Sequence, residues 1–192
     1  MNEHAPIRMP RALLLLAEGA EEMEVVITAD VLRRGGVEVV LASLGDDAPV
    51  RCSRGIYLSP DSRLVEVDGD FEVLVLPGGA EGVRRLCASK LVGHMLRGRE
   101  EAGAMVAAIC AAPLALRHHE AFAGRRMTCH PSVESRVMEH GERGTGDVVI
   151  DGNLITSRGP GTSFDFGLKL LSILRGDGLA ATVEKPLMLP AR

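Results

Sequence analysis

Short apolar runs recur along the chain and are separated by segments with helical periodicity. Continuous apolar runs bounded by polar residues are typical of strands that are buried on both faces of a sheet. Runs of this kind occur at Arg11–Ala17, Val37–Ser43, Phe71–Leu76 and Ala104–Ile109. Each is predicted to form a buried strand. Shorter strands are predicted at Val50–Leu58 and Leu64–Val67.

Helices are predicted between these strands. Glu21–Arg34 carries its apolar residues at helical spacing, and the pair Gly35-Gly36 marks its end. Further helices are predicted at Ser89–Glu101, Ala111–His119 and Thr162–Leu174, the last with Thr162 or Ser163 as its N-cap. A turn at Asp151-Gly152-Asn153 predicts a hairpin that joins strands at Asp147–Ile150 and Leu154–Ser157.

The alternation of strands and helices favours an α/β fold with a mostly parallel sheet flanked by helices. No Pro-, Gly- or Ser-rich linker divides the 192 residues, and no internal repeat is present. A chain of this length can bury a sizeable core as one domain. The sequence therefore predicts a single domain over residues 1–192.

Composition and charge argue against nucleic-acid binding. The 22 Lys and Arg residues face 26 Asp and Glu residues, so the net charge is −4, and the basic residues form no long run. Four Phe, one Tyr and no Trp leave little to stack against bases.

No segment has the features of an export signal or a membrane span. The first apolar run, Ala12–Ala17, is too short for the core of a signal peptide. The longest uncharged stretch, Gly103–Leu116, is too short to cross a bilayer and contains Pro113. We therefore expect a cytoplasmic protein that does not enter membranes, with its scattered cysteines present as free thiols.

The signature motifs of cofactor and metal sites are missing from the sequence. It contains no G-x-x-x-x-G-K-[ST], no G-x-G-x-x-G after a strand and no G-x-S-x-G. His119-Glu120 begins an H-E-x-x-H motif that fails at Ala123, and Cys129-His130 lacks further metal ligands. We therefore expect no metal and no cofactor, with chemistry performed by side chains alone.

Cys110 is the candidate nucleophile because it lies between a predicted strand and a predicted helix. In an open parallel sheet, ligands bind beyond the carboxyl ends of the strands, where residues 18–24, 77–79 and 109–113 should converge. The small residues around Cys110 permit a tight elbow. A thiol at a helix start faces the positive end of the helix dipole, which favours thiolate and predicts a lowered pKa. A small buried core cysteine explains the local pattern equally well.

Glu24 lies near the start of the first predicted helix. As a neutral acid it can hydrogen-bond to Cys110 and shuttle a proton. A solvated acid stabilised by the helix dipole is the stronger interpretation for Glu24 taken alone, and more so for Glu21 and Glu22. His130 is either a base near Cys110 or a loop histidine, and the spacing does not distinguish the two.

Two arginines are candidates for holding an anion. Arg54 and Arg158 each present a planar guanidinium that matches a carboxylate or phosphate, although a solvated surface charge is the default for either. Cys52 and Cys87 are interpreted as ordinary surface or packed thiols.

Six short segments in this order resemble the ThiJ/PfpI superfamily, and within it the DJ-one/YajL branch. They extend over nearly the whole chain, from about Arg11 to Leu189, and the order of all six is far more specific than any one of them. The segments are AEEME (20–24), CSR (52–54), VLPGG (75–79), AAICA (107–111), TCHP (128–131) and TSRGPGTSF (156–164).

This resemblance implies a flavodoxin-like fold with a nucleophile elbow, a domain core at about residues 11–189, and a homodimer. It implies that Cys110 is the reactive cysteine, that a protonated Glu24 hydrogen-bonds to it and lowers its pKa, and that His130 lies nearby without being a well-placed triad partner. It further implies that Gly79 and Ala111 are backbone donors around the sulfur. It implies that Arg54 and Arg158 line the polar side of the site, and that Cys52 is a second modifiable cysteine near the dimer interface.

The resemblance also implies a cofactor-independent glyoxalase or deglycase that acts on methylglyoxal, glyoxal or their early adducts and releases lactate or glycolate. Alternatives are a redox-sensing protective chaperone whose Cys110 is oxidised to sulfinate, a hydrolase of another activated acyl or anhydride metabolite, and a PfpI-type peptidase. Ala111 stands where the peptidase branch has a histidine, which argues against the last. Ser59 stands where some relatives have a further cysteine, so no redox role is expected there.

Overall fold

A seven-stranded sheet organises the computed structural model, which describes residues 8–190. The order of its strands is β10–β11–β7–β6–β1–β2–β5, and only β10 runs antiparallel to its neighbour. The strands are β1 (Arg11–Leu16), β2 (Glu38–Ser43), β5 (Ser62–Arg63), β6 (Val73–Leu76), β7 (Met105–Ile109), β10 (Val148–Asp151) and β11 (Leu154–Ser157). The predicted mostly parallel α/β fold is confirmed.

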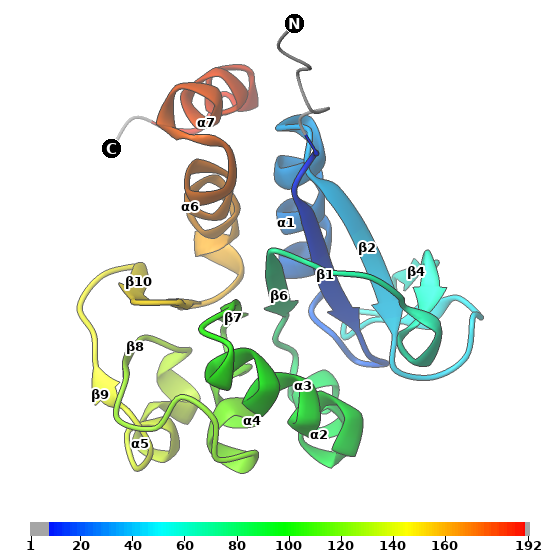
Figure 1. The fold of residues 1–192 in the computed structure, drawn as a ribbon, viewed down its shortest axis with the longest axis vertical. Helices are drawn as coiled ribbons and strands as arrows, with labels where there is room; N and C mark the ends of the chain where they lie inside the picture. Colours follow the sequence, from blue (N-terminus) through cyan, green and yellow to red (C-terminus); the bar gives the residue numbers. More distant parts are fainter. Residues whose placement is uncertain (1–7, 191–192) are drawn as a thin grey trace, which may run out of the picture.

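Two layers of helices cover the sheet. The longer helices are α1 (Glu22–Arg34), α2 (Ala80–Ala88), α3 (Lys90–Glu101), α6 (Ser163–Arg175) and α7 (Asp177–Glu184), and the shorter ones are α4 (Pro113–His118) and α5 (Glu134–Val137). Helices α1, α6 and α7 lie together on one side, whereas α2, α3, α4 and α5 lie on the other (Figure 1).

The two hydrophobic clusters follow from the alternation of side chains along each strand. In β1, Leu14 and Leu16 pack toward the α1 and α6 layer, whereas Leu13 and Leu15 pack toward the α2 and α4 layer. Successive residues of a strand point to opposite faces, so a strand with helices on both sides must be apolar throughout. This is why β1 appears in the sequence as an uninterrupted apolar run.

Helices α1 and α6 lie side by side because two glycines allow close approach. A Cβ atom at Gly35 would lie 2.1 Å from Leu171 Cδ1, and one at Gly167 would lie 3.1 Å from Val31 Cβ. Helix α1 advances four residues from Val31 to Gly35 while α6 advances four residues from Gly167 to Leu171. The two helices therefore run in the same direction.

Two of the predicted strands are wrong. Val50–Leu58 forms two short strands, β3 (Val50–Arg51) and β4 (Tyr57–Leu58), which pair with each other outside the main sheet. Leu64–Val67 contains a 3₁₀-helix at Leu64–Glu66, in which only Leu64 is buried and Val65 is 65% exposed. A segment this exposed does not provide the two buried faces of an inner strand.

Several elements were not predicted. Helix α2 begins directly after Gly79, which has φ 89°, and its Gly82 weakens the helical signal. Helices α5 and α7 and the strand pair β8 (Arg126–Met127) and β9 (Glu142–Arg143) were also missed, since each is short. The predicted N-cap of α6 is at Thr162, but its side chain makes no capping hydrogen bond.

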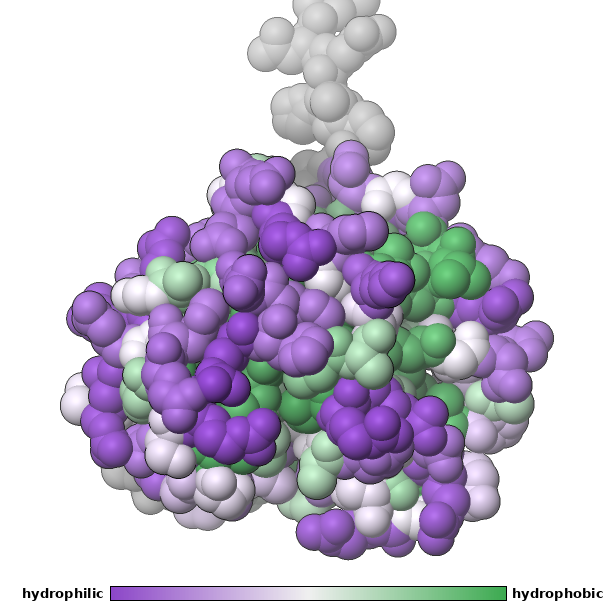
Figure 2. Space-filling view, turned by 90° about the horizontal axis from the view of Figure 1, so that it is seen from below, coloured by the Kyte–Doolittle hydropathy of each residue, from purple (hydrophilic) through white to green (hydrophobic). Residues whose placement is uncertain are grey.

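The surface seen from below in Figure 1 is largely hydrophilic, with hydrophobic residues confined to patches between the polar ones (Figure 2). Within residues 8–190, no helix is both long enough and apolar enough to cross a membrane.

Candidate functional site

The candidate site is built around the turn between β7 and α4. Cys110 occupies this turn with φ 64°, a left-handed conformation that costs a non-glycine residue about 1–3 kcal/mol. Two backbone hydrogen bonds hold it there: Cys110 N–H donates to Ser157 O (2.9 Å), and His130 N–H donates to Cys110 O (2.8 Å). These bonds to neighbouring segments hold Cys110 in its strained conformation. A tight elbow was predicted here from the small residues around Cys110.

Helix α1 brings Glu24 to the Cys110 thiol. The Glu24 side chain is only 1% exposed, hydrogen-bonds to the thiol of Cys110, and accepts a hydrogen bond from Gly78 N–H through Oε2 (2.6 Å). Gly78 leaves the space in which the two side chains meet. A Cβ atom there would lie 2.6 Å from Cys110 Cβ and 2.7 Å from Glu24 Oε2.

Burial changes the proton affinity of both members of this pair. Burial is the main cause that raises the pKa of Glu24 from 4.5 to about 7, against the hydrogen bonds from Gly78 and Cys110, which lower it. Burial, the charge of ionised Glu24 and the hydrogen bond to it raise the pKa of the Cys110 thiol to about 12. The predicted lowering of the thiol pKa is therefore wrong for the state in which Glu24 is ionised. Protonation of Glu24 removes two of these three causes, so the reactivity of the thiol depends on the proton held by Glu24.

Backbone amides supply the groups that favour thiolate. The N–H groups of Gly79 and Ala111 both hydrogen-bond to the Cys110 sulfur and act to lower its pKa. These two residues were predicted as the backbone donors of the site. Donors so placed can also stabilise a negative oxygen that develops on a molecule bonded to the sulfur.

His130 borders the sulfur without bonding to it. A Cβ atom at Gly159 would lie 3.5 Å from His130 Cδ2 and 3.9 Å from Cys110 Sγ, so these residues line one space. His130 Nδ1 lies 2.8 Å from Ser132 Oγ and accepts from Ser132 N–H (3.2 Å). The ring nitrogen that has partners therefore faces Ser132, and a role as base to Cys110 stays a prediction.

The two predicted anion-binding arginines are exposed. Arg158 pairs with Asp147 (3.3 Å between Nη1 and Oδ1), and the Arg54 guanidinium bonds only weakly to Ser53 O (3.5 Å). Their binding role stays a prediction. Cys52 is 3% exposed, and burial together with the charges of two glutamates raises its pKa to about 11, which opposes its predicted modification.

Glu21 and Glu22 are buried, although a solvated position was predicted for both. Glu21 is the N-cap of α1 and accepts from Glu24 N–H (2.8 Å). Glu22 accepts from Ser53 Oγ and from Arg54 N–H, both at 2.7 Å, and these bonds lower its pKa despite its burial. Glu22 thereby ties the segment after β3 to the start of α1. An acid in a first helical turn has the same sequence pattern whether it caps, clamps or is solvated, so no local signal could have separated these roles.

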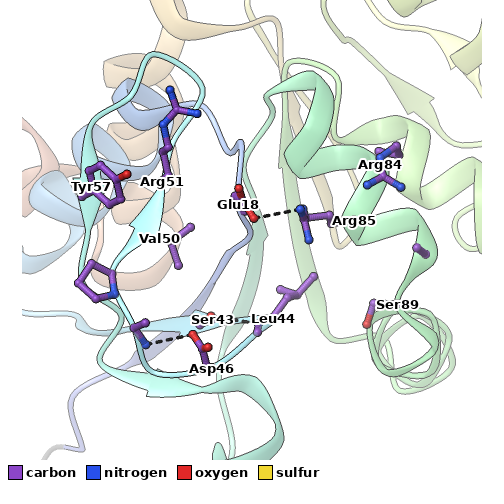
Figure 3. A pocket seen from close by; sticks show the side chains of 14 residues that line it. Glu18, Ser43, Leu44, Asp46, Val50, Arg51, Tyr57, Arg84, Arg85 and Ser89 are labelled. Carbon is purple, nitrogen blue, oxygen red and sulfur yellow. Dashed lines mark hydrogen bonds and ion pairs between the residues drawn. The ribbon is translucent and has the colours of Figure 1, made fainter.

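Two cavities lie near the ends of β1 and β2, and Cys110 lines neither of them. One of about 810 Å³ is bordered by the segments after β2 and around β3 and by α2, and it includes three arginines. In Figure 3, Arg85 forms an ion pair with Glu18 (3.0 Å) at this cavity, and Arg51 lies on its other side. A smaller cavity of about 330 Å³ contains Arg54 and also Ala80, the residue after Gly79. Among residues 8–190, no cluster of three or more His, Cys, Asp or Glu side chains is arranged to hold a metal ion.

A strained cysteine elbow, a buried glutamate hydrogen-bonded to the thiol and a mostly parallel sheet define a class of α/β proteins with a cysteine site at the carboxyl edge of the sheet. Residues 10–173 match the DJ-1/PfpI family, and the chain belongs to that family. The resemblance inferred from the six sequence segments is thereby confirmed.

Individual relatives extend over most of the chain. Protein DJ-1alpha of Drosophila melanogaster is 48% identical over 92% of this chain and 83% of its own length. A Caenorhabditis elegans protein named glutathione-independent glyoxalase DJR-1.2 is 39% identical over 92% of this chain and 95% of its own length. The crystal structure of Drosophila melanogaster DJ-1beta superposes with a TM-score of 0.93 at 43% identity, covering 96% of this chain and all of that one.

Proposed function

We propose that the protein is a cofactor-independent glyoxalase that converts an α-oxoaldehyde, such as methylglyoxal, and water into the corresponding 2-hydroxy acid. The observation that carries the proposal is the contact between Glu24 and Cys110 inside a ring of backbone donors. This arrangement supplies a nucleophile, a proton carrier and an oxyanion site without a metal. The relative from Caenorhabditis elegans that carries the name of a glyoxalase supports the assignment.

The chemistry begins when Cys110 Sγ bonds to the aldehyde carbon and the thiol proton passes to Glu24. The carbonyl oxygen becomes an oxyanion, which the Gly79 and Ala111 N–H groups stabilise and Glu24 then protonates to a hemithioacetal. Glu24 next removes the proton from the former aldehyde carbon, which gives an enediolate, and the hydroxyl proton passes from the oxygen of that carbon to the oxygen of the adjacent carbon. Glu24 then returns its proton to the adjacent carbon. The product is a 2-hydroxyacyl thioester, which water hydrolyses to the 2-hydroxy acid and the free thiol.

The raised pKa of Glu24 suits this sequence of proton transfers. An acid whose pKa is about 7 can both accept and donate a proton near neutral pH. An ordinary surface glutamate is almost fully ionised at that pH and donates poorly. Burial of Glu24 against Gly78 and Cys110 therefore supports its role as the proton carrier.

We further propose that the protein forms a homodimer through the exposed apolar side of α1. Met23 and Val26 on α1 are 50% and 48% exposed, and Ile56 is 55% exposed. Glu22 bonds to Ser53 and Arg54, and Ile56 O accepts from Cys52 N–H, so Ile56 belongs to the turn that is held against the start of α1. A Val26→Asp variant should sediment as a monomer, and a parent protein that is itself monomeric would overturn this proposal.

The activity is tested by the formation of lactate from methylglyoxal. Cys110→Ala should abolish turnover, whereas Cys87→Ala, which changes another partly buried thiol, should retain it. Both variants should unfold at temperatures close to that of the parent. Turnover by Cys110→Ala at the parent rate would overturn the proposal.

A further inference from the structure

Three buried oxygen atoms near the elbow have no hydrogen-bond partner among the described residues. They are Glu24 Oε1, Thr28 Oγ1 and Ser163 Oγ, and their residues are 1%, 0% and 0% exposed. A buried polar atom without a partner destabilises the folded protein, so three together require an explanation. In a helix, a threonine hydroxyl can bond to the carbonyl of the preceding turn, but Thr28 does not use this option.

The helix register brings these three side chains into one seam. Glu24 and Thr28 are four residues apart on α1, so their side chains lie on the same face. Gly167 meets Val31 and Gly35 meets Leu171, and one turn earlier this register places Ser163 opposite the turn that contains Thr28. Gly159, four residues before Ser163, is beside Cys110 Sγ, which places the start of α6 next to the elbow as well.

We propose that Glu24 Oε1, Thr28 Oγ1 and Ser163 Oγ together bind one buried water molecule. None of the three oxygens has a hydrogen-bond partner, and the helix register places them along the apolar packing of α1 against α6. Buried water molecules typically make about three hydrogen bonds to polar groups that lack protein partners. The site therefore has the polarity and the number of partners that such a water requires.

This water makes Thr28 and Ser163 positioning residues for Glu24. Oε2 already accepts a hydrogen bond from Gly78 N–H and lies beside Cys110. The proposed water therefore bonds to the other carboxylate oxygen of Glu24, Oε1. Hydroxyl groups and water can both donate and accept, so the seam can accommodate the acid and the carboxylate. It favours the carboxylate, because a hydrogen bond to a charged oxygen is the stronger one. The inference concerns the same Glu24 whose proton transfer is proposed above.

The effect is measured on Glu24 itself, without turnover. The ¹³C carboxyl resonance of Glu24, assigned by comparison with Glu24→Gln, is titrated in the parent, Thr28→Val and Ser163→Ala. Each variant should raise the titration midpoint by about one pH unit, because one hydroxyl that supports the carboxylate is lost. Thr28→Ser should return the midpoint to the parent value. The titratable groups that act on Glu24 are Cys110 and Glu21, and neither they nor the Gly78 N–H donor are changed.

Thr182→Val is the matched control. Thr182 is exposed on α7, where its hydroxyl bonds to Gly178 O (2.9 Å), so its loss should leave the midpoint unchanged. A crystal structure of the parent that resolves ordered water should show one water within about 3.2 Å of all three oxygens.

Two results would overturn the inference. One is a crystal structure in which the seam is dry. The other is a Thr28→Val protein that is more stable than the parent and has an unchanged Glu24 titration, as expected for a hydroxyl that is simply orphaned. Neither result depends on methylglyoxal turnover, so this inference and the proposed function can fail separately.

Discussion

Replacement of Gly78 by Ala tests whether the contact between Glu24 and Cys110 depends on the missing side chain at that position. The new Cβ atom would lie 2.6 Å from Cys110 Cβ, 2.7 Å from Glu24 Oε2 and 3.0 Å from Cys110 Sγ. Ordinary van der Waals contact begins at 3.4 Å, so the two Cβ atoms must separate by about 0.8 Å. Neither can turn away, because the backbone positions both and that of Cys110 is held by two hydrogen bonds.

The expected cost follows from this overlap. Overpacking of a tight site costs about 1–3 kcal/mol, which lowers the melting temperature of a protein of this size by about 2–12 °C. Misplacement of reacting groups by about 1 Å can reduce turnover by about 100-fold. We therefore expect Gly78→Ala to be folded, less stable and about 100-fold less active in lactate formation from methylglyoxal.

The assay pairs calorimetry with initial rates, and Gly98→Ala serves as the control. A Cβ atom at Gly98 would meet nothing within 4 Å, and the residue lies in α3, where Ala is favoured over Gly by about 1 kcal/mol. Gly98→Ala should thus be at least as stable as the parent and equally active. If Gly78→Ala also keeps the parent melting temperature and rate, the close packing inferred for the elbow is refuted.

Three further outcomes are expected. The pKa of Glu24 rises from 4.5 in the unfolded chain to about 7 in the folded one, so its stabilising contribution is complete below pH 4.5 and is lost as the pH rises through 7. In urea unfolding, the parent should lose about 3 kcal/mol of its free energy of unfolding relative to Glu24→Gln over that window. Parallel pH profiles of the two proteins would contradict this. Thr156→Val leaves the buried Thr128 N–H without its acceptor (2.9 Å) and should reduce the free energy of unfolding by about 1–3 kcal/mol, whereas an unchanged value would show that the bond contributes nothing. Glu22→Ala removes the acceptor of Arg54 N–H and should speed its hydrogen exchange, while equal exchange would mean that another contact holds this segment.

The inner strands and the elbow could be predicted from the sequence because each is indicated by the pattern of residues that are neighbours in the chain. A strand covered on both faces must be apolar at every position, and β1, β6 and β7 all show this in the sequence. The position of Cys110 between a strand and a helix, next to small residues, likewise follows from neighbours in the chain. The short outer strands were harder to predict. β3, β4 and β5 have two residues each, which is too few to show the hydrophobic pattern of a strand.

By itself, then, the sequence determined the layered α/β fold, the family and the place of the cysteine elbow. The fold and the elbow rest on patterns along neighbouring residues, and the family rests on the order of six short segments along the chain. Only the tertiary structure decided that Glu24 is buried against Gly78, 54 residues away in the chain, and that burial raises its pKa to about 7. It also decided that Glu22 clamps the segment at Arg54. The physical reason is that solvation and charge at a site depend on which distant segments meet there, and an acid in a first helical turn has the same local sequence whether it faces water or a thiol.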